Sequence, residues 1–180
     1  MDSKGSVLIL LVIVLALLSV LATTLVNVVY TNYTIRSLNI ESKRAFYLSE
    51  NELNESYVVA KKLIDEAIED SIEKAEDYIF EYPSNSEEAE IIFANNYKQY
   101  IAVNIRNRIS DCNPSVEVRN GGLVFVDETL NVLLRSTYAR ENNVVKITWL
   151  ELIIGVPNYD NVKNGSYELE DYIKFGNWRS

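Results

Sequence analysis

The sequence contains no histidine and a single cysteine, and these shortages remove most enzyme chemistry from consideration. Histidine is the commonest general acid or base, and no glycine-rich phosphate loop or serine elbow replaces it. Carboxylate pairs such as Asp127–Glu128 are typical of solvated charge when they lie at a turn. We therefore expect no enzyme, no catalytic residue and no cofactor. Cys112 has no disulfide partner, and we expect it to be a small buried apolar residue without chemistry.

Proline, glycine and basic clusters are also scarce. With three prolines, six glycines and 48% hydrophobic residues, the 180-residue chain is neither disordered nor a multi-domain protein. The charges of Asp2 and Lys4 cancel, and the next charged residue is Arg36. The formal net charge of -9 therefore falls on residues 36–180. Phosphate binding needs clustered lysine and arginine, which this acidic part lacks. We expect no direct nucleic-acid partner.

The apolar run SVLILLVIVLALLSVLATTLV, residues 6–26, carries no charge and follows directly on the polar start MDSKG. As a helix it spans roughly 31 Å, the thickness of the hydrocarbon core of a bilayer. Tyr30 and Tyr33 are typical of the headgroup region. We predict a transmembrane helix over residues 6–30 in contact with membrane lipid, with the N-terminus in the cytoplasm and the rest outside the cytoplasm.

The start of this run allows three interpretations. An ordinary signal anchor needs no cleavage. A secretory signal peptide would be cut after Ala22, but the apolar run is longer than the usual 7 to 15 residues or so. The third interpretation rests on Lys4-Gly5-Ser6, which resembles the site where prepilin peptidases cut after a glycine and leave the apolar helix on the mature protein. We favour the third, with residues 1–5 as a leader peptide and Gly5 and Ser6 as the processing site.

The helical pattern continues beyond the membrane. Residues 27–81 contain neither proline nor glycine, and apolar residues recur at helical spacing while acidic and basic residues occupy the opposite face. We predict an extracytoplasmic amphipathic helix over residues 31–82. β-branched residues and asparagine at 31–39 weaken helix propensity, so the pattern also permits a break or bend there.

The remaining residues, 83–180, predict an extracytoplasmic domain. Pro83 ends the first helix, and Ser84 with Glu87 has the spacing of a capping box for a second helix over 86–109. Strand-like segments follow, joined by short turns at 120–122, 127–128 and 141–143, which predicts an antiparallel meander. The predicted strands are 115–119, 122–126, 130–140 and 144–154. A change of apolar phase near Trp149 predicts a bulge.

A sheet with one apolar face needs a helical cover. We therefore predict an α+β fold in which a single N-terminal transmembrane helix, extended as a long amphipathic helix, packs with the second helix on a C-terminal antiparallel sheet. The aromatic residues of the tail, 155–180, are expected at the edge of the core. Its loop 158–166 offers oxygen ligands for calcium, but the spacing matches no EF-hand, and we predict no metal site.

Lys4-Gly5-Ser6, the uninterrupted apolar helix and the segment AFYLSE at residues 45–50 together resemble the N-terminal module of PilX-type minor pilins. The strand segment LRSTY at 134–138 is similar to the sheet of Gram-positive members. The resemblance implies a pilin-like fold, cleavage after Gly5 by a prepilin peptidase and methylation of the new N-terminus at Ser6. It also implies packing with other pilins or minor pilins, through the N-terminal helix, into a surface pilus or a pseudopilus.

Two positions depart from the family pattern. Most major pilins carry a glutamate as the fifth residue after the cut, and here that residue is Leu10. In related machines the subunit without this glutamate is thought to sit at the tip, so the resemblance implies a tip or priming subunit. The second departure is Ser49 and Asn51-Glu52, where small residues and a glycine are usual. The alternative hypothesis is a single-pass membrane-anchored module that binds a ligand or senses a signal outside the cytoplasm.

Overall fold

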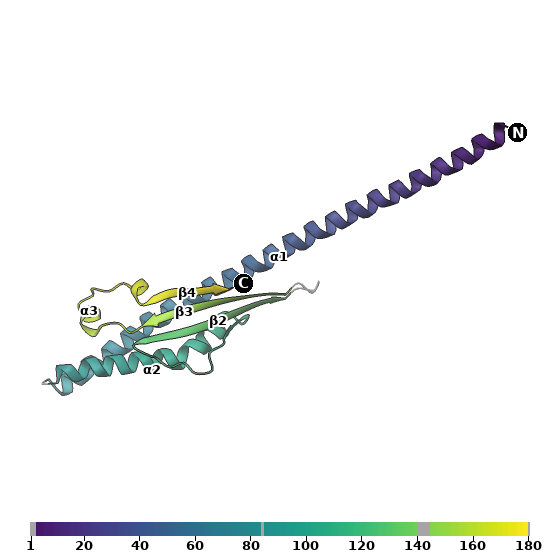
Figure 1. The fold of residues 1–180 in the computed structure, drawn as a ribbon. Coiled ribbons are helices and arrows are strands. Elements are labelled where there is room, and N and C mark those ends of the chain that lie inside the picture. Colours follow the sequence, from purple (N-terminus) through teal and green to yellow (C-terminus); the bar gives the residue numbers. More distant parts are fainter. Residues whose placement is uncertain (1–2, 84, 140–144, 180) are drawn as a thin grey trace. The chain divides into compact units, whose positions relative to one another are not determined.

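A computed structural model describes residues 3–83, 85–139 and 145–179 of the chain, with the side chains of residues 3–6 and 86 left undescribed. Figure 1 shows the helices and strands, coloured along the chain from purple to yellow. They are α1 (Ser3–Glu81), α2 (Ser86–Cys112), β1 (Val116–Val118), β2 (Thr129–Ala139), β3 (Val145–Gly155), α3 (Tyr159–Lys163), the 3-10 helix η1 (Leu169–Asp171) and β4 (Ile173–Arg179). The chain divides into two units, Met1–Lys43 and Arg44–Ser180, and α1 contributes to both.

Helix α1 is unbroken through residues 31–39, where the sequence also permits a break. After Gly5 the helix contains neither glycine nor proline, so no residue interrupts its backbone hydrogen bonds. The Thr34 hydroxyl, within the weak stretch, donates to the carbonyl of Tyr30 at 3.0 Å and is thereby satisfied without leaving the helix. The helix ends at Glu81 because Pro83 disfavours helical geometry at the residue before it.

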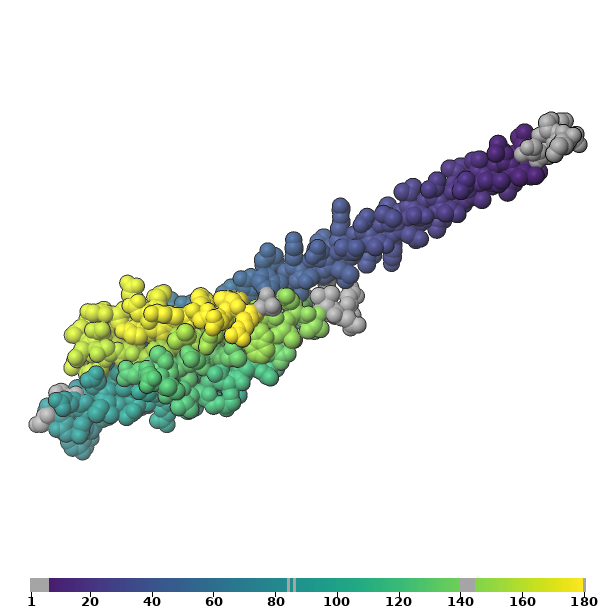
Figure 2. All heavy atoms as spheres, in the orientation of Figure 1, coloured from purple at the N-terminus to yellow at the C-terminus, as the bar shows by residue number. Residues whose placement is uncertain are grey.

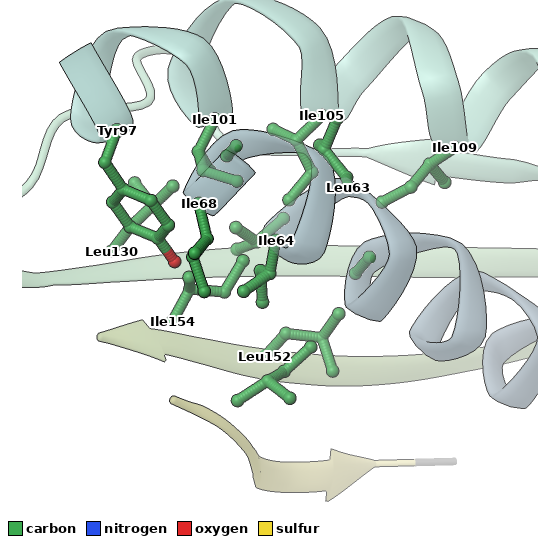
Figure 3. Packing of buried hydrophobic residues seen from close by; sticks show 14 of the residues in the cluster. Leu63, Ile64, Ile68, Tyr97, Ile101, Ile105, Ile109, Leu130, Leu152 and Ile154 are labelled. Carbon is green, nitrogen blue, oxygen red and sulfur yellow. The ribbon is translucent and has the colours of Figure 1, made fainter. Parts of the chain in front are cut away.

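Within the second unit, one stripe of α1 is buried against α2 and the sheet. Figure 3 shows Leu63 and Ile64 of α1 among side chains from α2 and the strands, including Ile105 and Leu152. The stripe repeats every three or four residues and consists of Ala45, Ser49, Leu53, Ser56, Ala60, Leu63, Ile64, Ala67, Ile68, Ser71 and Ala75. The expectation that the amphipathic half of the long helix covers an antiparallel sheet in an α+β domain is confirmed.

The sheet has the strand order β1-β2-β3-β4 with every neighbouring pair antiparallel. Strands β2 and β3 pair without interruption from Thr129–Gly155 to Ala139–Val145. Their even-numbered side chains from Leu130 to Ser136 and from Thr148 to Ile154 are fully buried under the helices. The odd-numbered side chains lie on the opposite face, which we call the outer face.

The predicted strand at 122–126 is wrong, although Leu123 and Phe125 do pack against the core. Its place beside β2 is taken by Asn120, whose side chain donates to the carbonyl of Asn131 at 2.9 Å and accepts from the backbone N–H of Leu133 at 2.5 Å. These are the edge groups that a strand at 122–126 would have used. Only an isolated bridge joins Val126 to Thr129.

The fourth strand is instead β4, in the tail where only core-edge aromatics are expected. It pairs with β3, and its alternation is hidden in the sequence because an extra residue interrupts it. The structure has an irregularity close to the bulge that we predict near Trp149. It lies in the pairing of β3 with β4, between Leu150 and Leu152, whereas the pairing of β3 with β2 is regular through Trp149.

Three smaller expectations have different outcomes. Helix α2 is longer than predicted, ending at Cys112, and its N-cap residue is Asn85. Ser84 and the turn at 141–143 lie outside the described residues. The expectation of a buried Cys112 is wrong, because this thiol is exposed at the last residue of α2.

Candidate membrane segment and processing site

The N-terminal part of α1 is an apolar helix whose side chains are exposed. Its most apolar stretch of 18 residues has a mean hydropathy of 3.0, and none of this stretch is buried. Figure 2 shows these side chains, in purple to blue, standing out from the helix. By length and composition this is the one helix in the described part of the chain able to cross a membrane. It is a candidate membrane-spanning segment near the N-terminus.

The few hydroxyl groups in this segment are satisfied inside the helix. Ser19 donates to the carbonyl of Leu15 at 2.9 Å, and Thr23 and Thr24 donate to the carbonyls four residues before them at 2.8 Å each. An unpaired hydroxyl in hydrocarbon costs several kcal/mol, roughly 4–8 by cyclohexane transfer. Because these three groups need no water, they add little cost to placing the segment in lipid.

Gly5 and Ser6, the predicted processing site, lie in the first turns of α1. The first four N–H groups of a helix have no partner within it, so its first turn frays easily. Glycine adds to this, because it costs about 1 kcal/mol relative to alanine in a helix. A peptidase that needs an extended peptide would therefore open the helix at residues 3–6 at lower cost than anywhere in the apolar run that follows.

Leu10 stands where the resembling family usually has a glutamate. Its side chain is 63% exposed, as are its neighbours at 51–67%, so it belongs to the continuous apolar surface. The segment from residue 7 to residue 35 contains no charged side chain at all. This chain thus has no acidic group in the apolar helix that would pair with the N-terminal amine of a neighbour.

The segment at 45–50, which carries the resemblance, packs on the sheet through its small residues. Ala45 and Ser49 are buried, whereas Tyr47 between them is 64% exposed. The Ser49 hydroxyl donates to the carbonyl of Phe46 at 2.9 Å and lies 2.7 Å from the hydroxyl of Thr148 on β3. Ser49, a departure from the family pattern, therefore forms a buried polar contact between α1 and the sheet.

This contact is part of a short polar seam along α1. The Ser136 hydroxyl of β2 donates to the carboxylate of Glu52 at 2.7 Å, and the Asn113 side chain lies 3.1 Å from the Ser56 hydroxyl. The apolar pattern of the sequence does not predict this seam, because serine does not contribute to that pattern. The spacing of residues 45, 49, 53 and 56 is the one feature from which it can be predicted.

Several of the ionisable groups with shifted pKa values make structural contacts within the domain. The pKa of Glu170 is lowered and that of Lys61 is raised, in each case because their side chains are hydrogen-bonded to each other. Burial raises the pKa of Tyr97, whose hydroxyl donates to the carbonyl of Gly155 at 3.1 Å. These pairs join α1 to η1 and α2 to β3, so their role is to hold the domain together.

The loop with candidate calcium ligands uses one of them for capping. The side-chain oxygen of Asn158 accepts from the backbone N–H of Asn161 at 3.2 Å at the start of α3. Across residues 3–83, 85–139 and 145–179, no three His, Cys, Asp or Glu side chains lie close enough together to hold a metal ion.

Comparison with protein-family models, with curated proteins and with solved structures gives no match to this chain in any of the three.

Proposed function

We propose that this chain is a minor pilin-like structural subunit of a type IV pilus or pseudopilus, in a tip or priming position. The observation that carries the proposal is that α1 continues without interruption from a bare apolar segment into the central helix of an α+β domain. The residues at 4–6 and 45–50 that resemble PilX-type minor pilins lie on this same helix.

A simple anchor does not need this arrangement. An anchor crosses the bilayer and then commonly passes into a flexible linker, whereas here neither glycine nor proline occurs between Gly5 and Pro83. Exposed apolar side chains also extend beyond Arg36, the first charged residue after the apolar run, with Leu38 at 50% and Ile40 at 65% exposure. A helix with apolar side chains all round needs either lipid or other helices as its surroundings. Helices of neighbouring subunits in a filament core would supply them.

Leu10 supports the tip or priming position. A glutamate in an apolar filament core is stable only when it is paired, because an unpaired buried charge is strongly unfavourable. A subunit with leucine here has no such group and needs no partner in the next layer. It also gives up the ion pair that would set its register in a repeating filament.

These features lead us to propose the following order of events, from membrane insertion to assembly. The N-terminus starts in the cytoplasm and the domain lies outside it, with the apolar helix in membrane lipid. A prepilin peptidase cleaves after Gly5, the amine of Ser6 is methylated, and the helix then packs with other pilins or minor pilins. No direct contact with nucleic acid and no catalysis are part of this proposal.

The competing function is a single-pass anchored module that binds a ligand outside the cytoplasm. The observation that favours it is a pocket on the outer face of the sheet. The two functions differ in processing. Gly5→Leu should block removal of the leader and leave the full-length chain in the membrane, whereas Ser3→Ala, two residues away in the leader, should be processed normally.

The measurement is the mass of the chain recovered from cells that carry a prepilin peptidase and from cells that lack it. A peptidase-dependent loss of residues 1–5 in wild type and in Ser3→Ala, but not in Gly5→Leu, supports the assembly subunit. Equal masses for all variants in both kinds of cell refute it and favour the anchored module.

A further inference from the structure

The outer face of the sheet, opposite the helices, carries a pocket of about 440 Å³. Its lining comes from three strands, with Asn131 of β2, Trp149 and Glu151 of β3, and Asn177 and Arg179 of β4. All these residues belong to the second unit. A filament subunit that acts only through its helix has no need of a concave, mixed aromatic and polar surface here.

The bulge in β4 shapes this pocket. Leu150 pairs with Trp178 and Leu152 pairs with Phe175, so both Gly176 and Asn177 face Glu151. A Cβ atom on residue 176 would lie 2.9 Å from Oε2 of Glu151, so the missing side chain of Gly176 leaves room for this carboxylate to lie across β4. There the amide of Asn177 donates to Oε2 at 3.1 Å. Bulges of this kind re-aim side chains at binding sites.

The opposite wall is held in place as well. The two hydrogen bonds of the Asn120 side chain to the β2 backbone fix this residue, which also lines the pocket. The guanidinium carbon of Arg135 lies 5.6 Å from the ring centroid of Trp149 and restrains the indole. A pocket whose walls are fixed before a ligand arrives loses less entropy on binding.

Several polar groups in the pocket have no partner. Among the described residues, Oε1 of Glu151, the side-chain amide of Asn131 and the guanidinium of Arg179 make no hydrogen bond or ion pair. They present acceptors and donors together, and the one formal negative charge and the one formal positive charge cancel. A simple anion would meet Glu151 and a simple cation would meet Arg179. The charge balance therefore favours a ligand without net charge that both donates and accepts hydrogen bonds.

We propose that this pocket binds a neutral saccharide of one or two sugar rings. Each sugar hydroxyl donates and accepts, which suits the mixed carboxylate, amide and guanidinium groups. The C–H groups on one face of a pyranose ring are weakly positive and pack favourably on the electron-rich face of an indole such as Trp149. The volume falls within the usual range for small-ligand pockets, about 300–1,000 Å³.

The test uses the full chain in lipid nanodiscs or in a detergent without a sugar headgroup, since maltosides and glucosides would compete for the pocket. The background variant Trp178→Phe leaves Trp149 as the one tryptophan, because the sequence contains two. The probes are glucose, galactose, mannose, N-acetylglucosamine and lactose, with sodium sulfate and glycine as charged and zwitterionic comparators. Binding is followed by Trp149 fluorescence and by saturation-transfer NMR of the ligand.

We expect at least one saccharide to give a saturable signal at millimolar concentration or below, with none from sulfate or glycine. In the NMR assay Trp149→Leu should weaken binding by about tenfold or more, and Glu151→Ala by a similar factor. The matched control is Trp178→Phe, because Trp178 pairs with Leu150 on the buried face. Unchanged thermal unfolding of each variant would show that the fold is intact.

Three results would overturn the proposal. They are the absence of saturable binding by any saccharide in the panel, binding that survives Trp149→Leu, or binding of glycine in place of the sugars. None of these results bears on cleavage after Gly5, so saccharide binding by the pocket and the assembly role are tested independently.

Discussion

Removing the Ser49 hydroxyl should destabilise the domain more than removing its partner on the sheet. Ser49 and Thr148 are both fully buried, and their oxygens lie 2.7 Å apart. Ser49 already donates its one hydrogen to the carbonyl of Phe46, so Thr148 is the donor in the contact between the two side chains. The two substitutions therefore have unequal consequences.

In Ser49→Ala the Thr148 hydroxyl stays buried without its acceptor, which costs about 1–3 kcal/mol of unfolding free energy. In Thr148→Val the shape is kept and Ser49 still donates to the carbonyl of Phe46. Only one net hydrogen bond is lost, at a cost of about 1 kcal/mol. The double variant leaves no buried hydroxyl at this place, so it should be less destabilised than the sum of the two single variants.

Urea unfolding of the full chain in one detergent, followed by circular dichroism, measures these free energies. Ser56→Ala is a useful comparison, because the hydroxyl of Ser56 also bonds to the carbonyl of Glu52 within α1 and contacts Asn113 rather than the sheet. If Thr148→Val is the more destabilising single change, the assigned hydrogen-bond direction is wrong. If the two single effects add without coupling, the hydrogen bond between the two side chains does not contribute to stability.

Two further predictions concern β4 and the face between α1 and α2. Gly176→Ala should lower the unfolding free energy by about 1–3 kcal/mol, because the new methyl group would lie 3.1 Å from Cβ and Cγ of Glu151 as well as 2.9 Å from its carboxylate. Gly121→Ala, with no atom within 4 Å, should be nearly neutral, and equal effects in urea unfolding would contradict this. The Lys74 ammonium and the Asn96 amide lower the pKa of Asp70, so the stability that ionised Asp70 contributes is present above its unfolded pKa of about 3.9 and is lost as the pH falls through the lower folded pKa. The difference in unfolding free energy between wild type and Asp70→Asn should therefore shrink between about pH 7 and about pH 3, and a constant difference would argue against the assigned cause.

The long helix and the two central strands are predictable because their signals are local. An apolar run without charge, followed by a 3.6-residue period without proline or glycine, permits little besides α1. Strands β2 and β3 alternate along most of their length, and their buried faces follow from that alternation. In β3 the apolar side chains of Ile147 and Trp149 lie on the outer face, so the apolar positions change from odd to even numbers along the strand. The pairing with β2 is nevertheless regular.

The remaining features depend on contacts between distant residues. The segment at 122–126 alternates like a strand, but the Asn120 side chain occupies the backbone groups with which it would pair. Strand β4 is concealed by its own bulge at Gly176 and Asn177. The pocket on the outer face likewise has no sequence motif, since only the register of three strands brings its residues together. The proposed processing at Gly5 is a different case, because it would depend on a second protein.

The most direct test of the pilin-like role is the intact mass and N-terminal sequence of the protein taken from its native membrane. We expect a chain that begins at a methylated Ser6 and lacks residues 1–5. A chain that begins at Met1 would contradict the pilin-like role and favour an anchored binding module. A chain that begins at Thr23 would show a secreted protein that has lost the apolar part of α1.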